Sequence, residues 1–360
     1  MFNASRLCLA RKRRRLTAKG FAELLGMSPV TVTRLEAGQN EPEPETVDAM
    51  ARVLDFPREF FFGDDIDELT KDAASFRSLT SMTAKEREAA LAAGALAYLL
   101  SDWVAARFNL PEPDLIDLSQ ERDPEAAART LRQHWALGEQ PISNMLQLLE
   151  AKGVRVFSLA ENTQNVDAFS CWRNGVPYVF LNTFKSSEHS RFDAAHELAH
   201  LILHRHGGPR QGRESEIEAN QFASSFLMPL RDVAARIPFV SKLDQLVSAK
   251  RRWGVSVAAL AYRLHKIDVL TDWQYRTFCI QINSRGYRTQ EPCALPREES
   301  VVWKKVFSQL WKDRISKNQV AATLHIPSSE IENLVFGLVG TSAQPSLGDR
   351  SIRTPLRAVK

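Results

Sequence analysis

The sequence is poor in cysteine and contains no long apolar run. Its four cysteines, among 360 residues, lie far apart, and no two of them form a Cys-x-x-Cys pair. This spacing argues against a disulfide scaffold and a zinc ribbon, and it predicts a protein of the reducing cytoplasm. No apolar stretch reaches membrane-spanning length, and the first ten residues lack the apolar core of a signal peptide. We therefore expect no membrane partner.

An excess of charge of one sign is also lacking, since the formal net charge is only +4. The charge is nevertheless unevenly distributed, because residues 1–40 carry eight basic and two acidic side chains. A basic N-terminus on a nearly neutral protein indicates a polyanionic partner. A charged run by itself is usually only a solvated surface, so this feature needs a second signal.

The most specific pattern is His-Glu-x-x-His at residues 196–200. Side chains four residues apart share a face of a helix, so His196 and His200 can bind one metal ion, with Glu197 at the edge of that face. Two imidazoles and an adjacent carboxylate are the groups of a zinc hydrolase, in which Glu197 is the catalytic proton acceptor. His204, one turn further on, either lies near the metal or is an ordinary packed or exposed histidine.

A third metal ligand is expected from residues 214–229, whose apolar side chains are spaced as one helical face. We favour Glu218, because a small residue follows it and permits close approach of two helices. Glu214 and Glu216 are the alternatives, and a surface helix rich in carboxylates is the simplest competing interpretation. A His₂Glu set leaves a fourth position for water, which predicts one Zn²⁺ ion per chain.

Three short segments upstream of the histidines predict β-strands. Residues 153–159, 168–172 and 176–182 are rich in Val, Phe and Tyr, and Asn174-Gly175 between the last two is a hairpin signal. A small sheet before a metal-binding helix offers an edge along which an extended peptide can lie.

The N-terminal segment has the pattern of two short helices joined by a tight turn. Thr17 is a suitable N-cap, Gly26 ends the first helix, and Ser28-Pro29 begins a second helix that ends at Gly38. This is a helix-turn-helix pattern, in which the second helix reads the major groove of DNA.

Candidate DNA contacts lie on the outward side of the second helix and in the basic run. Arg34 could reach a phosphate or pair with a nearby carboxylate, whereas Val30 is expected in the core. The candidate DNA-binding residues are Ser28, Thr31, Thr33, Arg34, Arg13, Arg14 and Arg15.

Residues 6–62 closely resemble the XRE (lambda-repressor-like, Cro/cI-type) DNA-binding domain. The resemblance is carried by Leu16-Thr17, Ala22-x-x-x-Gly26-Met-Ser, Thr31-Val-Thr-Arg-Leu-Glu36-x-Gly38, Pro42-x-Pro44 and Ala51-x-Val-Leu-Asp-Phe-Pro57. It implies a five-helix domain. A domain of this kind is expected to bind double-stranded DNA as a homodimer on a pseudo-palindromic operator.

The segment from about residue 120 to 240 resembles the ImmA/IrrE metallo-endopeptidases. The matching stretches are residues 141–142, 149–154, 166–170, 191–204 and 218–229. Position by position, the resemblance implies His196, His200 and Glu218 as zinc ligands and Glu197 as the catalytic carboxylate. The order of the two domains resembles bacterial and phage-borne regulators, and some members of that family cleave a DNA-binding repressor.

These signals predict a mainly α-helical fold with a small β-sheet (α+β). The expected segments are a DNA-binding domain (1–66), a helical connector (67–120), a zincin-like peptidase domain (121–268), a mixed C-terminal accessory region (269–341) and a disordered tail (342–360). In the accessory region we expect a strand at 273–282. Residues 315–334 faintly repeat the helix-turn-helix rhythm, either as a second DNA reader or, preferably, as a helical pair packed on the peptidase domain.

The leading functional prediction is a sequence-specific transcriptional regulator whose zinc endopeptidase cleaves a partner repressor or regulatory protein. The alternative is a non-proteolytic regulator, or an antitoxin-like protein, whose zinc site is a sensor or a structural element. The presence of Glu197 favours the first, because a purely structural site does not need this carboxylate.

Overall fold

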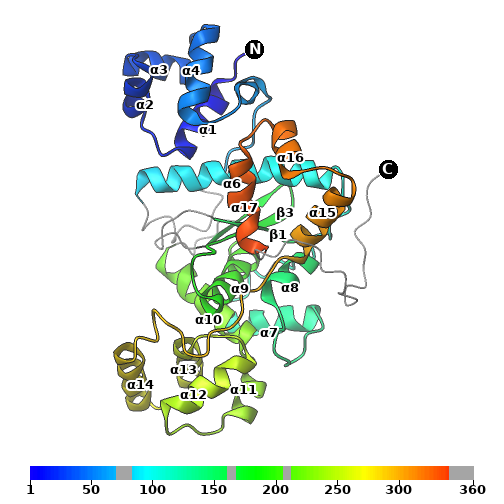
Figure 1. Cartoon of the computed structure of the whole chain (residues 1–360). Helices are drawn as coiled ribbons and strands as arrows, with labels where there is room; N and C mark the ends of the chain where they lie inside the picture. The colour runs from blue at the N-terminus through cyan, green and yellow to red at the C-terminus, as the bar shows by residue number, and fades with distance from the viewer. Residues whose placement is uncertain (70–82, 160–167, 206–211, 340–360) are drawn as a thin grey trace. The chain divides into compact units, whose positions relative to one another are not determined.

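The computed structural model describes residues 1–69, 83–159, 168–205 and 212–339. Helices dominate, and one three-stranded sheet has the strand order β1-β3-β2 (Figure 1). The predicted α+β class is therefore confirmed. The chain divides into two compact units: one contains Met1–Leu110, Phe157–Val166 and Val301–Lys360, and the other contains Pro111–Val156 and Asp167–Ser300.

The N-terminal domain has four α-helices and a short 3-10 helix. They are α1 (Ala4–Arg13), α2 (Ala18–Leu25), α3 (Pro29–Glu36), α4 (Pro44–Leu54) and η1 (Arg58–Phe62). The side chain of Thr17 accepts a hydrogen bond from the Gly20 amide, and that of Ser28 accepts one from the Thr31 amide. Gly26 has a φ of 67°, the left-handed region in which glycine is not strained. The two caps and the glycine turn give the predicted helix-turn-helix.

The core of this domain is built on the inner face of α3. Val32 and Leu35 are buried, whereas Val30 is 59% exposed. The expectation that Val30 packs in the core was wrong, because residues two apart are separated by about 200° around a helix. Val30 and Val32 therefore face opposite sides.

The connector contains one long helix, α6 (Ala84–Ala105), whose first turn is closed by a capping box between Thr83 and Glu86. Within its unit, α6 packs against α1 and against two C-terminal helices, α16 (Lys317–Leu324) and α17 (Ser328–Val335) (Figure 1). Contrary to the sequence-based expectation, α6 alone among the described residues has the length and composition of a membrane span. Since 72% of that window is buried, packing inside the protein accounts for its apolar character.

The second unit contains the predicted hairpin. β1 (Arg155–Ser158), β2 (Phe169–Arg173) and β3 (Val176–Leu181) form the sheet, and β2 pairs antiparallel with β3. Asn174 and Gly175 have positive φ angles of 51° and 78°, as a two-residue hairpin turn requires. All three predicted strands are present, each with slightly different bounds.

Helix α9 (Ser187–Leu203) is at the centre of this unit and carries the two histidines. It packs on α10 (Arg213–Leu227), on α8 (Met145–Ala151) and on the face of β2 and β3, while α10 also packs on α7 (Pro124–His134). Phe222 and Phe226 of α10 are fully buried, and the Phe226 ring packs edge-to-face on Trp135 at the end of α7, so this apolar face holds α10 against α7.

Shorter helices follow in the same unit. They are α11 (Leu230–Arg236), α12 (Leu243–Ala249), η3 (Lys250–Arg252), α13 (Val257–Lys266) and α14 (Asp272–Ser284). The predicted strand at 273–282 was wrong, because this segment lies within α14. Thr271 and Gln274 form a capping box, and the buried Phe278 and Ile282 are one helical turn apart.

The C-terminal helices are α15 (Val301–Lys312), α16, α17 and η4 (Phe336–Leu338). They belong to the unit of the N-terminal domain and not to the unit that carries the histidines. The preferred interpretation, a helical pair packed on the peptidase domain, was therefore wrong. The predicted disordered tail, 342–360, lies outside the described residues.

Candidate functional site

Helix α9 presents His196 and His200 on one face. Their Nε2 atoms are 3.1 Å apart. The carboxylate of Glu216 completes this group, because its Oε2 lies 3.3 Å from His196 Nε2 and its Oε1 lies 3.5 Å from His200 Nε2. Among the described residues, these three form the cluster of side chains that could hold a metal ion.

Glu218, the third ligand predicted from the sequence, lies elsewhere. Its Oε2 is 3.0 Å from Nε2 of His204, and Glu214 is exposed. Glu216 and Glu218 are two residues apart and therefore point about 200° away from each other around α10. Only one of them can face the histidine pair, and the structure brings Glu216 there.

The three residues fit a zinc ion. Ligands at about 2.0–2.1 Å from zinc in tetrahedral geometry lie about 3.3 Å from one another. The observed separations of 3.1, 3.3 and 3.5 Å are close to that value. His200 and Glu216 are buried, so an ion bound here is held largely away from solvent.

A second layer of side chains orients both imidazoles. His196 Nδ1 lies 3.2 Å from Asn220 Oδ1, an acceptor, which favours the tautomer with the proton on Nδ1 and the Nε2 lone pair toward the site. His200 Nδ1 lies 3.0 Å from His204 Nδ1, and His204 Nε2 lies 3.0 Å from Glu218 Oε2. Because the Glu218 carboxylate accepts from His204 Nε2–H, His204 Nδ1 accepts from His200 Nδ1–H. His200 thus also presents an unprotonated Nε2, the form that binds metal.

Glu197 is held by the sheet. Ser170 of β2 donates a 2.7 Å hydrogen bond from Oγ to Glu197 Oε2, and Glu197 is 3% exposed. Trp172, also on β2, donates from its indole nitrogen to the carbonyl of Leu201. These contacts place strand β2 directly against the helix that carries the histidines.

The charges of the cluster are coupled. Burial opposes the charged form of Glu216, but hydrogen bonds to His196 and His200 outweigh it and hold the pKa of Glu216 well below its usual value. Burial likewise opposes protonation of His196, but Glu216 and Glu197 together raise its pKa. The site therefore attracts a positive charge, which a proton supplies when no metal is bound, and metal binding must displace that proton.

The candidate DNA-binding face lies on α3. Ser28 is exposed, but its Oγ is engaged at the helix start, 3.1 Å from the Thr31 amide and 2.8 Å from Thr31 Oγ1. Thr33 is also exposed and donates from Oγ1 to the carbonyl of Pro29. These hydroxyls retain acceptor capacity toward DNA, although each already makes a bond within the helix.

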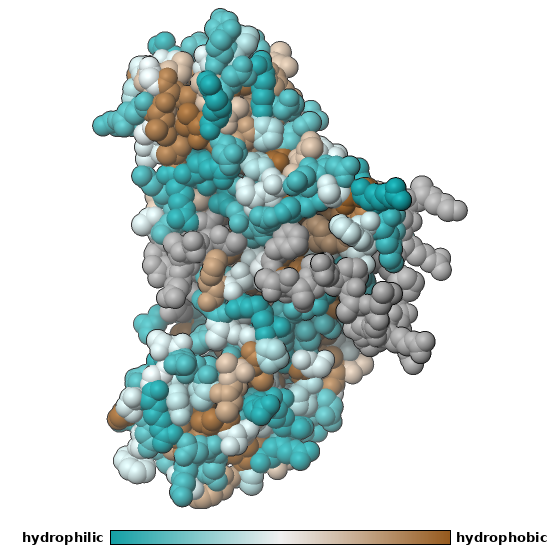
Figure 2. Space-filling model, viewed as in Figure 1, coloured by the Kyte–Doolittle hydropathy of each residue, from teal (hydrophilic) through white to brown (hydrophobic). Residues whose placement is uncertain are grey.

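Apolar surface accompanies these polar side chains. Leu24 of α2 and Val30 of α3 are each 59% exposed, and Figure 2 shows hydrophobic surface over these two helices. Arg34 is exposed on the same helix as Val30. An exposed valine can contact a thymine methyl group, and an arginine can bind a phosphate or a guanine. Val30 is thus a candidate DNA contact, although the sequence predicts it in the core.

The three arginines of the basic run lie in a different environment. Arg13 is 8% exposed, and both Arg13 and Arg14 form ion pairs with Glu330 of α17. Arg15 has a φ of 57° in the turn after α1 and is half-buried. The structure does not bring Arg13 and Arg14 together with the exposed face of α3, because their guanidinium groups face protein.

The sequence itself carries a signal for the third ligand. Glu216 and Asn220 are one helical turn apart and both face the histidines, the former toward Nε2 atoms and the latter toward Nδ1 of His196. A carboxylate and an amide at this spacing share a face. No comparable local signal marks Glu330, because its partners lie more than 300 residues away in the sequence.

Two family models match the chain. Residues 149–265 match an IrrE N-terminal-like domain, and residues 4–60 match a helix-turn-helix domain. The first match contains the His196, His200 and Glu216 cluster, and the second contains α1 to α4. No curated protein matches the chain. The chain thus joins an XRE-like helix-turn-helix domain to a domain of the IrrE/ImmA type, which is a metallopeptidase family.

Proposed function

We propose that this protein is a DNA-binding transcriptional regulator that carries a zinc-dependent endopeptidase. The observation that carries the proposal is the spacing of donor atoms in His196, His200 and Glu216, which suits one tetrahedral ion. Glu197 directly follows the first of these residues, where a hydrolytic zinc site needs a carboxylate. The XRE-like domain supports the DNA-binding half.

The residues around the cluster have distinct chemical roles in this proposal. A bound zinc ion supplies a Lewis acid for water and for the substrate carbonyl group. Glu197 accepts a proton from the attacking water and then donates it to the leaving amine. Ser170 holds the Glu197 carboxylate in one orientation through its hydrogen bond to Oε2. Asn220 and His204 keep the two histidines in the metal-binding tautomer.

The substrate form that the sheet favours is an extended peptide. Among the described strands, whose order is β1-β3-β2, β2 is at an edge, and Ser170 on β2 contacts Glu197. A peptide that adds to this edge runs along the strand nearest to the catalytic carboxylate. We therefore propose a protein substrate, a repressor or another regulatory protein, that is cut within an extended segment.

The DNA-binding domain directs this activity to an operator. We propose that it binds double-stranded DNA as a homodimer on a pseudo-palindrome with half-sites about one helical turn apart. Attachment to DNA raises the effective concentration of the peptidase near proteins bound at the same locus. Because the target is DNA, the proposed site of action is the cytoplasm.

The test compares the wild type with Glu197→Gln. This variant is expected to retain zinc and DNA binding and to lose cleavage of the partner by about 10²- to 10⁴-fold, because it removes only the proton acceptor. The partner is identified as the protein that is cut in cells expressing the wild type and intact in cells expressing the variant. Full zinc retention in a His196→Ala, His200→Ala double variant would rule out the metal site.

A zinc-bearing regulator without turnover is the second candidate. In its favour, Glu197 is only 3% exposed and already carries a hydrogen bond, so a substrate must first gain access to it. This candidate predicts that Glu197→Gln leaves the expression of neighbouring genes unchanged under inducing conditions. A variant that cannot bind DNA then alters their expression, which separates the two functions.

A further inference from the structure

The C-terminal helices repeat the geometry of the N-terminal helix-turn-helix. Adding 299 to the bounds of α2 (Ala18–Leu25) and α3 (Pro29–Glu36) gives the bounds of α16 (Lys317–Leu324) and α17 (Ser328–Val335). The end of α1, Arg13, corresponds in the same way to the end of α15, Lys312. The repeat therefore covers three helices and both turns between them.

The backbone and the core repeat as well. The turn residues Arg15 and Arg314 both have a φ of 57°, and Gly26 and His325 both adopt the left-handed conformation. Each second helix begins with a hydroxyl N-cap, Thr17 or Ser316. The buried pairs related by the same offset are Phe21 and Val320, Ala22 and Ala321, Val32 and Ile331, and Leu35 and Leu334. We refer to α15, α16 and α17 as the second motif.

The positions that are proposed to face DNA in the first motif have side chains of a different chemical character in the second motif. The corresponding pairs are Ser28 and Pro327, Thr31 and Glu330, Thr33 and Glu332, and Arg34 and Asn333. One positive charge and three hydroxyl groups are thereby replaced by two carboxylates, a proline and an amide. Two carboxylates at these positions repel a phosphate backbone, so the second motif is unsuited to read DNA with α17.

Glu330 instead faces the first motif. It is fully buried, its Oε2 accepts a 2.8 Å hydrogen bond from Arg13 Nε, and its Oε1 accepts a 2.6 Å hydrogen bond from Arg14 Nη1. The first turn of α17 thus meets the last turn of α1, and each helix dipole favours the charge that it carries there. Arg14 also donates to the carbonyl groups of Leu54 and Asp55 at the end of α4, which fixes its direction.

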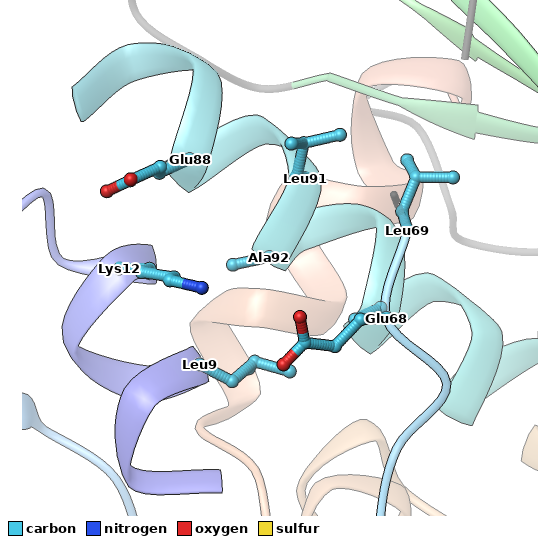
Figure 3. A pocket seen from close by; sticks show the side chains of 8 residues that line it. Leu9, Lys12, Glu68, Leu69, Glu88, Leu91 and Ala92 are labelled. Atoms are coloured by element: carbon cyan, nitrogen blue, oxygen red, sulfur yellow. The ribbon is translucent and has the colours of Figure 1, made fainter. Parts of the chain in front are cut away.

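Helix α1 also packs against α6. A pocket of about 200 Å³ lies at this junction, with Leu9 and Ala92 among its apolar lining and Lys12, Glu68 and Glu88 as its charged groups (Figure 3).

We infer that the second motif is a duplicated helix-turn-helix that binds the DNA-binding domain of its own chain. The Glu330 carboxylate pairs with Arg13 and Arg14, which otherwise bind DNA phosphates. The inference rests on the DNA-binding half of the proposed function. It means that Arg13 and Arg14 are withheld from DNA while α17 is docked. Release of α17 then strengthens binding to any duplex without changing sequence preference.

The experiment measures the salt dependence of non-specific duplex binding by the full chain. Glu330→Gln removes the buried charge and is expected to steepen the slope of log K against log salt by up to about 1.8, since each phosphate contact contributes about 0.9. Affinity at low salt should rise about tenfold or more. Glu332→Gln is the matched control, because Glu332 is a residue of the same helix that pairs with Lys317 at the surface. It should leave the slope unchanged.

Arginine variants in both backgrounds complete the test. In the otherwise wild-type chain, Arg13→Gln with Arg14→Gln should leave the slope unchanged, whereas in the Glu330→Gln background the same pair should abolish the gain. A flatter slope on substitution of the arginines in the otherwise wild-type chain would overturn the inference, since they would then contact DNA with α17 docked. An unchanged slope in Glu330→Gln would overturn it equally.

A measurement without DNA separates this inference from the proposed function. Amide hydrogen exchange in residues 328–335 should accelerate at least tenfold in Glu330→Gln relative to Glu332→Gln, because a released helix loses protection. Equal exchange in the two variants contradicts the inference even if the wild type binds no DNA. If Glu330→Gln fails to fold, Glu330→Asp is the substitute, because it keeps the charge but shortens the side chain by one methylene. It should change the slope of the salt dependence and the rate of amide exchange in the same direction, but by less.

Discussion

The choice between Glu216 and Glu218 as the third zinc ligand leads to the sharpest prediction. Glu216→Gln removes a charged oxygen that lies 3.3 and 3.5 Å from the two imidazole Nε2 atoms. Glu218→Gln changes only the partner of His204, one side chain further from the site. Glu214→Gln is the control, because it makes the same substitution at an exposed position of the same helix.

The expected magnitudes differ enough to be measured. Zinc sites with four protein ligands have apparent binding free energies of about 10–16 kcal/mol, so one ligand corresponds to about 3 kcal/mol, or on the order of 100-fold in Kd. Removing a side chain that hydrogen-bonds a metal ligand typically weakens metal affinity by about 10- to 100-fold. The amide introduced by Glu218→Gln still offers an acceptor oxygen to His204. We therefore expect the zinc affinity of this variant to fall by about tenfold or less.

Competition with a chromogenic chelator gives Kd, and thermal unfolding at a fixed zinc concentration gives an independent readout. At a zinc concentration of about 100 times the wild-type Kd, bound metal stabilises the wild type by about 2.7 kcal/mol, and a 100-fold weaker variant by about 0.4 kcal/mol. Glu216→Gln should therefore lose most of the stabilisation by zinc, Glu218→Gln should keep about half of it or more, and Glu214→Gln should keep all of it. If Glu218→Gln loses as much zinc affinity as Glu216→Gln, or if Glu216→Gln loses none, the assignment from the donor spacing is refuted.

Three further predictions concern other parts of the chain. Ser170→Ala should keep its zinc affinity and lower kcat/KM by about tenfold, because it removes one hydrogen bond to a charged group. Ser170→Thr should restore activity. If kcat/KM of the alanine variant equals that of the wild type, Ser170 does not position Glu197. Lys250 is fully buried between Glu188 and Glu291. Lys250→Met should therefore lower the free energy of unfolding, measured by urea titration, by about 3–5 kcal/mol. An unchanged midpoint of the urea transition would contradict this prediction. Val30→Ser should shift the base preference at one position per half-site by about 1–3 kcal/mol, as measured in a selection of bound DNA sequences. An equal loss of affinity for all DNA sequences would show that Val30 contacts no base.

The sequence by itself determined the features that depend on neighbouring residues. Thr17, Gly26 and Ser28 specify the helix-turn-helix, because caps and left-handed turns are formed by atoms within a few positions of each other. The Asn174-Gly175 turn specifies the hairpin for the same reason. Local composition also led to a wrong prediction. Residues 273–282 are rich in aromatic and β-branched side chains, which predicts a strand, but they follow a capping residue and fold as a helix.

Tertiary structure decided which side chains meet across elements. The rotation of α10 about its own axis, fixed by the burial of Phe222 and Phe226 against the rest of the unit, brings Glu216 and not Glu218 to the histidines. Glu330 reaches Arg13 and Arg14 across more than 300 residues of sequence, and no local pattern encodes that distance. A helical repeat fixes which residues share a face, but the packing of several helices fixes what that face touches, and packing is a property of the whole core.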